Sequence, residues 1–476
     1  MPLDRLSEFI AQSARAESAN LPPGVVHSAK RCIIDWFAAT IPGGMVPPAT
    51  MLAEAFGDEL DRGGAMLLPS GRRASPGMAA LINGAASHVL EFDDIFRDAI
   101  YHPGAPVISA ALAMAQADGA DGARFLGSVV AGYEVSTRIG VAMLPAHYDF
   151  WHPTGTVGSL GAAAACSAIL NLDPAQAAHA LANAADMAAG LQQAFRSDSM
   201  AKPFHTGRAA ECGVLVTRAA RAGVTGARGM LDGDRGFGAA MSRDVDWATA
   251  TEGLGSRYNI TAMSQKNHAC CGHVFAAVDA TLSLMAEHRL KPDDVARISV
   301  GTFAMALEVA GFADPRTAFE AKFSLAYCVS AAAVTGRVRL AAFAPERLAD
   351  PAIRALMQRI EIAVDTQADA AFPNQRTAVV EIETRDGARH RHHAATRKGD
   401  PDDPLSDDEL VDKYTELVAP VIGDQAAAAL LEYLWRIETA DDMAALPVNL
   451  AEQDRAEFGA GAGEAKDRKR AHHEAR

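Results

Sequence analysis

An acidic segment of the sequence combines residue types that could carry out proton transfer. Glu91, Asp93 and Asp94 fall within four positions, and His102 follows eight residues later. On a helix, Glu91 and Asp94 would share a face and Asp93 would point elsewhere. Carboxylates this close raise one another's pKa, so one of them could act as a base near neutral pH. An acidic helix end in water is the common alternative. However, apolar alanine-rich sequence flanks the segment, and burying such a cluster is costly without a function.

Four further polar segments stand at predicted helix ends, where catalytic residues often collect. They are residues 151–155, 202–210, 266–273 and 321–327. Each has a structural alternative: His152 before a proline is more often a helix cap or core histidine, and Lys202 and Arg208 could be surface charges. Lys202 also precedes a proline, which predicts an extended backbone at a helix start. From there its ammonium could meet a substrate carboxylate beside helix N–H groups.

Neither a metal centre nor a nucleotide site is predicted. The six cysteines form no CxxC pair, which argues against an iron–sulfur cluster and a disulfide framework. His268, Cys270, Cys271 and His273 suggest zinc, but a second ligand pair at zinc-site spacing is missing. The glycines of residues 154–170 do not follow a phosphate-loop pattern and predict a tightly packed buried helix.

Composition narrows the class of protein further. The 476 residues are 49 % hydrophobic and 22 % charged, as in a globular enzyme with two or three domains. The net charge of −15 argues against nucleic acid as a partner, but leaves room for an anionic small molecule in a locally basic pocket. Residues 1–20 are polar and amphipathic, without a signal-peptide or membrane-spanning pattern, so we expect a cytoplasmic protein without a membrane partner.

The hydrophobic patterns predict a mainly α fold. A large all-helical domain is expected from both chain ends, 1–265 and 405–450, with a smaller α+β domain over 266–404 and a disordered tail over 451–476. Helices are predicted at 6–18, 23–39, 47–56, from Pro76, 106–118, 123–142, 154–170, from Pro174, 316–333, 351–359, 406–418 and 425–436. A strand is predicted at 295–302, and a hairpin at 378–384 and 388–396 around an Asp-Gly turn.

Taken together, the polar segments resemble the MmgE/PrpD family. That family includes 2-methylcitrate dehydratase, cis-aconitate decarboxylase and iminodisuccinate epimerase. The resemblance runs from near the N-terminus to about Glu432, and its motifs are specific as a set. The matching stretches are Asn83 to His88, Glu91 to Asp94, His102-Pro103, His152-Pro153-Thr154, Lys202-Pro203 with His205 and Gly207, and Ala321 to Ser324 with Tyr327.

The resemblance implies a homodimer without metal or organic cofactor, a smaller lid domain, and an active site between the two domains. It implies a small di- or tricarboxylic acid as substrate. By motif position, the catalytic candidates are Glu91, Asp94, His102, His152, Lys202 and Tyr327. The substrate-binding candidates are Lys266, Cys271, His273, His205 and Arg208, and no metal ligands are assigned.

This chain departs from the family pattern at several positions. They are Glu91, where Asp is common, Ile95, where Thr is common, Gly104, where Ser is common, and His268-Ala269, which replace an aromatic residue and proline. A histidine of the decarboxylases aligns with Cys271, which weakens the decarboxylase interpretation, although His273 lies two residues on. These differences bear on the substrate.

The residue types agree with the chemistry of this family. Removing a proton next to a carboxylate needs a base, cations that bind carboxylates, and a donor for the developing charge or the leaving group. Dehydration, decarboxylation and epimerisation share this step or its reverse. We therefore predict a cofactor-independent lyase of the 2-methylcitrate dehydratase kind. An epimerase or a decarboxylase on the same scaffold, a non-catalytic helical scaffold and a metal hydrolase remain alternatives.

Overall fold

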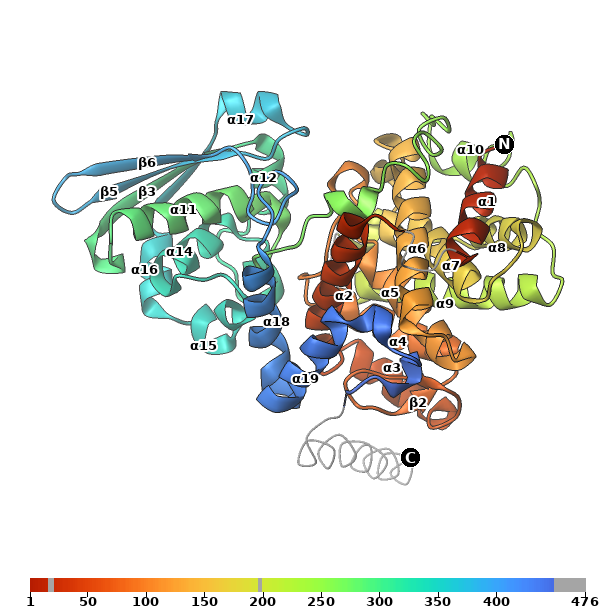
Figure 1. Cartoon of the computed structure of the whole chain (residues 1–476). Coiled ribbons are helices and arrows are strands. Elements are labelled where there is room, and N and C mark those ends of the chain that lie inside the picture. Colours follow the sequence, from red (N-terminus) through yellow and green to blue (C-terminus); the bar gives the residue numbers. More distant parts are fainter. Residues whose placement is uncertain (16–20, 196–198, 449–476) are drawn as a thin grey trace, which may run out of the picture. The chain divides into compact units, whose positions relative to one another are not determined.

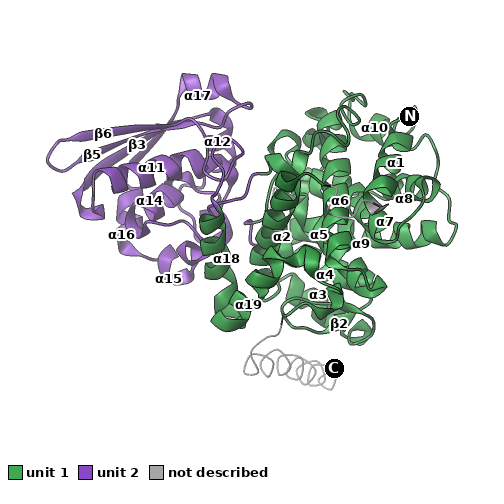
Figure 2. Ribbon diagram, in the orientation of Figure 1, with its two compact units in different colours: residues 1–89, 93–263, 407–476 green, residues 90–92, 264–406 purple. Residues whose placement is uncertain are grey.

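The computed structural model describes residues 1–15, 21–195 and 199–448, and these are mainly α-helical, which confirms the predicted fold class. The chain forms two compact units (Figure 2). Unit 1 contains residues 1–89, 93–263 and the chain from 407 onward, and unit 2 contains residues 90–92 and 264–406. The tail predicted to be disordered, 451–476, lies outside the described residues.

Unit 1 is built from helices of both chain ends (Figure 1). Its helices are α1 (Pro2–Arg15), α2 (Pro23–Gly43), α3 (Ala49–Ala55), α4 (Pro76–Val89), α5 (Gly104–Asp118), α6 (Gly122–Met143), α7 (Pro153–Ile169), α8 (Pro174–Asp186), α9 (Ala201–Arg221), α10 (Phe237–Met241), α18 (Asp407–Ile422) and α19 (Asp424–Trp435). A short antiparallel pair, β1 (Ala65–Met66) and β2 (Arg73–Ala74), precedes α4. Most predicted helices lie within a few residues of these bounds.

Small side chains let the helices of unit 1 approach closely. All residues of α7 are buried, and this helix packs against α5, α6, α8 and α9. The glycine-rich stretch is therefore a core helix, as predicted. Where α4 meets α9, a Cβ atom on Gly207 would lie 2.2 Å from the carbonyl oxygen of Leu81. A Cβ atom on Gly84 would lie 2.9 Å from the Cα of Gly207, so backbone packs directly on backbone at this crossing.

This contact predicts that Gly207→Ala destabilises the protein. The added methyl group has no room beside the Leu81 carbonyl, so the two helices must move apart, at a cost of about 1–3 kcal/mol. The measurement is the urea midpoint of unfolding by circular dichroism. Gly24→Ala is the matched control, because nothing lies within 4 Å of a Cβ atom there. Equal midpoints for the two variants would contradict the prediction.

A buried ion pair joins α18 to α2. The Lys413 ammonium lies 2.6 Å from a carboxylate oxygen of Asp35, and both side chains are fully buried. Burial raises the pKa of Asp35, and the charge of Lys413 opposes that rise. Lys413 therefore opposes the protonation of Asp35 inside the helical core, and it ties the C-terminal helices to the N-terminal part of the chain.

Unit 2 contains a four-stranded sheet in the order β4-β3-β5-β6. β3 (Val295–Thr302) is parallel to β4 (Ile360–Val364) and antiparallel to β5 (Ala378–Thr384), which forms a hairpin with β6 (Arg389–Ala394). The predicted strand and hairpin are confirmed. Buried and part-exposed residues alternate along β5, and α11 (Phe275–Glu287) packs against β5 and β6 (Figure 1).

The helices of unit 2 are shorter than predicted. The single helix predicted over 316–333 is wrong, because the chain forms α13 (Ala318–Lys322) and α14 (Leu325–Thr335) instead. Ser324 lies between them in an extended conformation, and its hydroxyl accepts a hydrogen bond from the backbone N–H of Tyr327. Such a serine cap starts a new helix. The remaining helices are α12 (Ala304–Val309), α15 (Pro345–Leu348), α16 (Pro351–Met357) and α17 (Thr366–Ala371).

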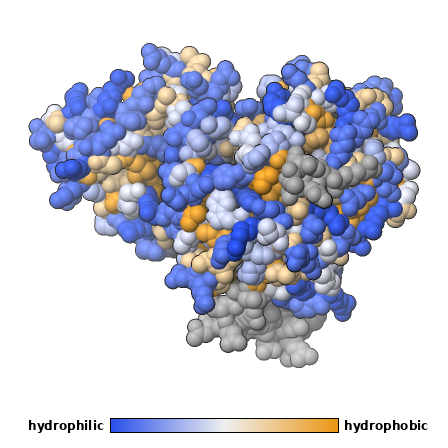
Figure 3. Space-filling model, viewed as in Figure 1, coloured by the Kyte–Doolittle hydropathy of each residue, from blue (hydrophilic) through white to orange (hydrophobic). Residues whose placement is uncertain are grey.

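One face of the molecule carries mostly hydrophilic side chains. On the face shown in Figure 3, apolar residues form small separate areas within a largely hydrophilic surface. Across residues 1–15, 21–195 and 199–448, no helix has the length and apolar character that crossing a bilayer would require.

Candidate active site

The acidic segment is not helical. α4 ends at Val89, and Glu91 has a φ of 58°, in the left-handed region that few non-glycine residues adopt. The prediction that Glu91 and Asp94 share a helix face is therefore wrong. The two residues also belong to different units, Glu91 to unit 2 and Asp94 to unit 1. Asp93, which was expected to point away, contacts histidines instead.

Four histidines and one aspartate gather in unit 1. We call His88, His102, His152 and His205 the histidine cluster. Asp93 Oδ2 lies 2.7 Å from Nδ1 of His88 and 3.2 Å from Nδ1 of His102. The ring of His88 lies 4.7 Å from that of His102 and 5.8 Å from that of His152, centre to centre. Nδ1 of His152 lies 3.3 Å from Nδ1 of His205.

Each member of the histidine cluster stands at or near a helix end. His88 lies in the last turn of α4, His102 two residues before α5, His152 at the N-cap of α7, and His205 near the start of α9. Small residues fill the spaces between these helices, so their ends can converge. The structure thus brings together three predicted site residues, His102, His152 and His205.

Sequence reasoning missed His88 and Asp93. They are five residues apart, a spacing that does not place side chains on one helix face. The turn after Val89 brings them into contact, because the chain leaves the helix there. Both residues lie in stretches that match the family motif, Asn83 to His88 and Glu91 to Asp94, and this was the signal that could have found them.

Burial and neighbouring charges shift the pKa values of Asp93 and His152. Burial favours the neutral form of Asp93, but the charges of His88 and His102 and their hydrogen bonds lower its pKa well below the usual range. Burial lowers the pKa of His152 well below its usual value, and the nearby charges of His88 and Lys202 lower it further. The site therefore holds a carboxylate beside an imidazole, His152, that stays neutral at neutral pH.

Lys202 lies next to the histidine cluster. Its ammonium is 5.5 Å from the ring centre of Phe195, and that ring meets His152 edge-on at 4.9 Å. The extended backbone predicted for Lys202 is wrong, because α9 already begins at Ala201. The proline that follows Lys202 lies in the first helical turn, where its missing N–H costs no hydrogen bond.

Arg208 is not brought to the cluster by any contact in the described structure. Its guanidinium forms an ion pair with Glu211 at 2.7 Å, with both side chains partly exposed. His205 belongs to the histidine cluster and Lys202 lies next to it, whereas no such contact supports the predicted substrate-binding role of Arg208.

Asp94 is buried next to the start of α5. One of its oxygens accepts a hydrogen bond from the Gly104 N–H at 3.0 Å, and the other accepts one from the Tyr133 hydroxyl at 2.7 Å. Burial, followed by the charges of Asp35 and Asp93, raises the pKa of Asp94 to about 8. A Cβ atom at Gly104 would lie 2.8 Å from both Asp94 Oδ1 and the Tyr133 hydroxyl, so this packing requires glycine.

The raised pKa of Asp94 predicts a pH-dependent stability. Between the usual value of 3.8 and about 8, the folded protein holds a proton that the unfolded chain has lost, so stability falls as pH rises. Asp94→Asn removes this dependence. We expect the variant to gain stability relative to the parent from pH 5 to pH 8, by an order of a few kcal/mol.

The measurement is the urea midpoint at pH 5, 6.5 and 8, read by circular dichroism. Asp98→Asn is the control, because its side chain is 66 % exposed and should show no such trend. A difference between Asp94→Asn and the parent that stays constant with pH would show that Asp94 is ionised in the folded state throughout this range.

In unit 2, two lysines hold the segment Leu90–Phe92. Lys266 Nζ donates to the Glu91 carbonyl oxygen at 2.9 Å and lies 3.4 Å from a Glu91 carboxylate oxygen. Lys322 Nζ donates to the Leu90 carbonyl oxygen at 2.9 Å. These contacts fix the left-handed conformation of Glu91. The predicted candidates Glu91 and Lys266 are thus partners of each other.

His273 and Cys271 are buried in unit 2. Burial, followed by the charges of Arg376 and Arg397, lowers the pKa of His273 to about 3. Burial raises the pKa of Cys271 to about 11. Both side chains are therefore neutral at pH 7, and any binding of a substrate anion here would draw its charge from the neighbouring lysines and arginines.

Tyr327 is buried in α14. Its hydroxyl donates to the Ala342 carbonyl oxygen at 2.6 Å, and burial raises its pKa to about 12. The predicted role of Tyr327 as an acid would require this hydrogen bond to break.

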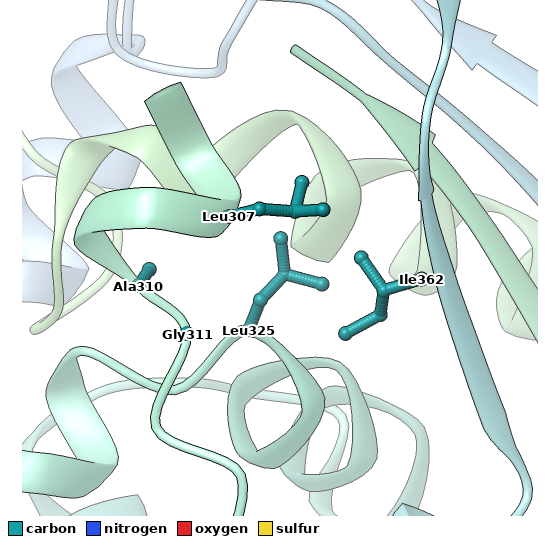
Figure 4. A pocket seen from close by; sticks show the side chains of 5 residues that line it. All are labelled: Leu307, Ala310, Gly311, Leu325 and Ile362. Atoms are coloured by element: carbon teal, nitrogen blue, oxygen red, sulfur yellow. The ribbon is translucent and has the colours of Figure 1, made fainter. Parts of the chain in front are cut away.

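Unit 2 also contains an apolar pocket of about 230 Å³ (Figure 4). It is lined by Leu307, Ala310, Gly311, Leu325 and Ile362. None of these side chains can bind a carboxylate, so this pocket does not fit the substrate that the sequence predicts.

His88, Asp93 and His102 offer ligand atoms of types that bind divalent metals, all within 4.8 Å of one another. The 2.7 Å contact between His88 and Asp93 has the length of a hydrogen bond, so a metal ion would have to displace its proton. The absence of a metal requirement remains a prediction.

Two family models match the chain, and the second extends past unit 2 into the C-terminal helices of unit 1. Residues 4–250 match the model of the MmgE/PrpD N-terminal domain, and residues 268–438 match that of the MmgE/PrpD C-terminal domain. A cis-aconitate decarboxylase-like protein of Aspergillus oryzae, oryM, is 28 % identical over 453 residues, 90 % of this chain and 93 % of the relative. The cis-aconitate decarboxylases of Homo sapiens and Mus musculus are each 26 % identical, covering 79 % of this chain and 79 % and 78 % of the relatives.

Proposed function

The chain belongs to the MmgE/PrpD family, and from this premise we propose that it is a cofactor-independent lyase acting on a small di- or tricarboxylic acid. Family membership and the decarboxylase relatives support an enzyme of the lyase type. The observation that carries the proposal is the histidine cluster: a buried carboxylate holds two imidazoles beside a neutral His152 and the cationic Lys202. These are the groups that abstraction of a proton next to a carboxylate needs.

The proposed reaction is the loss of water from a hydroxy acid. His102 or His152 takes the proton from the carbon next to a substrate carboxylate, and the electron pair forms the new double bond as the C–O bond breaks. The leaving hydroxyl takes a proton from a protonated imidazole and departs as water. Lys202 binds a substrate carboxylate and keeps it in place through both proton transfers. In unit 2, Glu91 remains a proposed catalytic residue, and Lys266, Cys271 and His273 remain proposed substrate-binding residues.

Decarboxylation of an unsaturated tricarboxylic acid is the second candidate, and the names of the relatives favour it about as well. There the carboxylate leaves as CO₂, and an imidazolium protonates the resulting carbanion. Cys271, where decarboxylases carry histidine, is the sequence feature that speaks against it. The same groups could also exchange one α proton, which would make the protein an epimerase.

The test is a screen of the purified protein against 2-methylcitrate, citrate, cis-aconitate and iminodisuccinate in D₂O, followed by proton NMR. Loss of water, release of CO₂ and deuterium exchange with inversion distinguish the three reactions. Turnover should persist after dialysis against EDTA. Loss of turnover that a divalent metal restores, or the absence of deuterium exchange into every acid tested, would overturn the proposal. We also propose a homodimer, which light scattering would show as about twice the mass of one chain.

We expect Lys202→Ala to raise KM by about 10- to 100-fold with a much smaller change in kcat. A charged hydrogen bond to a substrate carboxylate contributes about 1.5–3 kcal/mol, and it is made in both the bound substrate and the transition state. Steady-state kinetics on the substrate found in the screen provides the measurement. Lys291→Ala removes an exposed lysine and should leave both constants unchanged. A fall in kcat alone would place Lys202 in the chemical step instead.

A further inference from the structure

We propose that Asp93, which also holds His88, is a positioning residue that fixes the tautomer of His102, so that the Nε2 lone pair of His102 is available to the substrate. This inference rests on the proposed function only in assigning the proton transfer to His102. The arrangement itself can be tested without a substrate.

The geometry of Asp93 carries the argument. A single carboxylate oxygen, Oδ2, lies within 3.2 Å of Nδ1 on both rings, and the side chains of His88, Asp93 and His102 are 0 %, 2 % and 10 % exposed. A carboxylate only accepts hydrogen bonds. The 2.7 Å contact to His88 is a hydrogen bond, whereas the 3.2 Å contact to His102 is a close ion-pair contact without ordinary hydrogen-bond geometry. A ring nitrogen with a lone pair would be repelled by the carboxylate at either distance, so we place hydrogen on both Nδ1 atoms. In the neutral rings, each Nε2 atom then holds the lone pair.

Asp93 supplies one negative charge, and it contacts the rings of both His88 and His102. Asp93 can compensate one added proton, but two imidazolium rings with centres 4.7 Å apart would repel each other in a buried site. The trio therefore holds at most one extra proton, on one ring or the other. In the described structure, Nε2 of His88 is buried without a hydrogen-bond partner.

Other titratable groups around His88, Asp93 and His102 also affect how many protons these three side chains hold. His152, at the N-cap of α7, and Lys202 and His205, in α9, lie near these residues, and the charges of His88, Lys202, His205 and His102 all act on His152. Asp94 lies next in sequence, and Asp35 of α2, paired with Lys413 of α18, adds a more distant negative charge. Asp93 is the carboxylate in direct contact with these imidazoles, so it decides which nitrogen carries the hydrogen.

Asp93→Asn tests this role. An asparagine can turn its amide N–H₂ toward a ring, which then presents a lone pair at Nδ1 and carries hydrogen at Nε2. A ring in that tautomer cannot take a proton from the substrate, as an aspartate-to-asparagine change in a serine protease triad shows. We expect kcat to fall about 100-fold with KM within about 3-fold. The acid limb of the kcat profile should move to lower pH, because the anion that favours the protonated trio is gone.

The direct measurement is ¹⁵N NMR of protein labelled at its histidines, with His88 and His102 assigned from the missing signals of His88→Gln and His102→Gln. In the parent, both rings should show the Nδ1–H form, and in Asp93→Asn at least one should change to Nε2–H. Asp93→Glu should retain the parent tautomer and restore part of kcat. Asp98→Asn is the matched control.

The Nε2–H form on His102 of the parent would overturn the inference, even if Asp93→Asn fails to fold. Unchanged tautomers in a folded Asp93→Asn variant would do the same. If the substrate screen finds no turnover but the tautomers behave as expected, the proposed function fails while the positioning role stands.

Discussion

Replacing His102 with glutamine is expected to lower kcat by about 100-fold or more, as the loss of a general base usually does. Glutamine keeps a hydrogen-bond donor that can face Asp93, so the buried carboxylate retains a partner, but its amide cannot take up a proton at neutral pH. Steady-state kinetics on the identified substrate gives kcat, and circular dichroism shows whether the fold is kept.

His27→Gln serves as the control for this variant. His27 is about half exposed and pairs with Asp407, outside the histidine cluster, so the same substitution there should leave kcat unchanged. If His102→Gln retains near parental kcat, the base must be sought at His152. That ring is buried beside Lys202 and neutral at pH 7, so His152→Gln would then be expected to show the loss.

Replacing Lys413 with methionine is expected to destabilise the protein by about 3–5 kcal/mol. The change leaves Asp35, which is fully buried, without its cation. Because burial already raises the pKa of Asp35, this carboxyl should then fold protonated, and the loss of stability should grow as pH rises from 5 to 8. Urea unfolding at both pH values provides the measurement.

The double variant Asp35→Asn with Lys413→Met separates loss of the pair from loss of packing. It should recover much of the stability, since no unpaired charge stays buried. Arg436→Met is the exposed counterpart: it breaks an ion pair with Glu432 whose side chains are 66 % and 69 % exposed, and should cost less than about 1 kcal/mol. A loss for Lys413→Met no larger than this would contradict the expectation.

Local patterns in the sequence were sufficient to predict most elements. The strand at 295–302 and the helices of unit 1 follow from hydrophobic periodicity, which reports burial directly. The break between α13 and α14 was missed because a serine cap inside an apolar stretch competes with the longer helix. The backbone at Glu91 could not be predicted, because lysines about 175 and 230 positions away hold it.

The site was only partly predictable, because some of its contacts also depend on more than the local sequence pattern. His102, His152 and His205 were assigned from their positions in the family motif. His88 and Asp93 lie in matching stretches too, but no role was assigned to them, because their contact exists only where the chain leaves α4. Neighbouring carboxylates were expected to raise the pKa of Asp94, whereas burial is the larger cause, and burial depends on helices far along the chain.

The discontinuity of unit 1 has a consequence for synthesis on the ribosome. α18 is translated after the whole of residues 264–406, although Lys413 is the partner of Asp35 in α2. Asp35 and Lys413 are 378 positions apart, so at about 5–20 residues per second α2 waits roughly 20–75 s for that partner. Unit 2 needs only residues 90–92 from the earlier chain, so its parts are complete first. The nascent protein must therefore keep an unfinished helical core from aggregating until its last helices emerge.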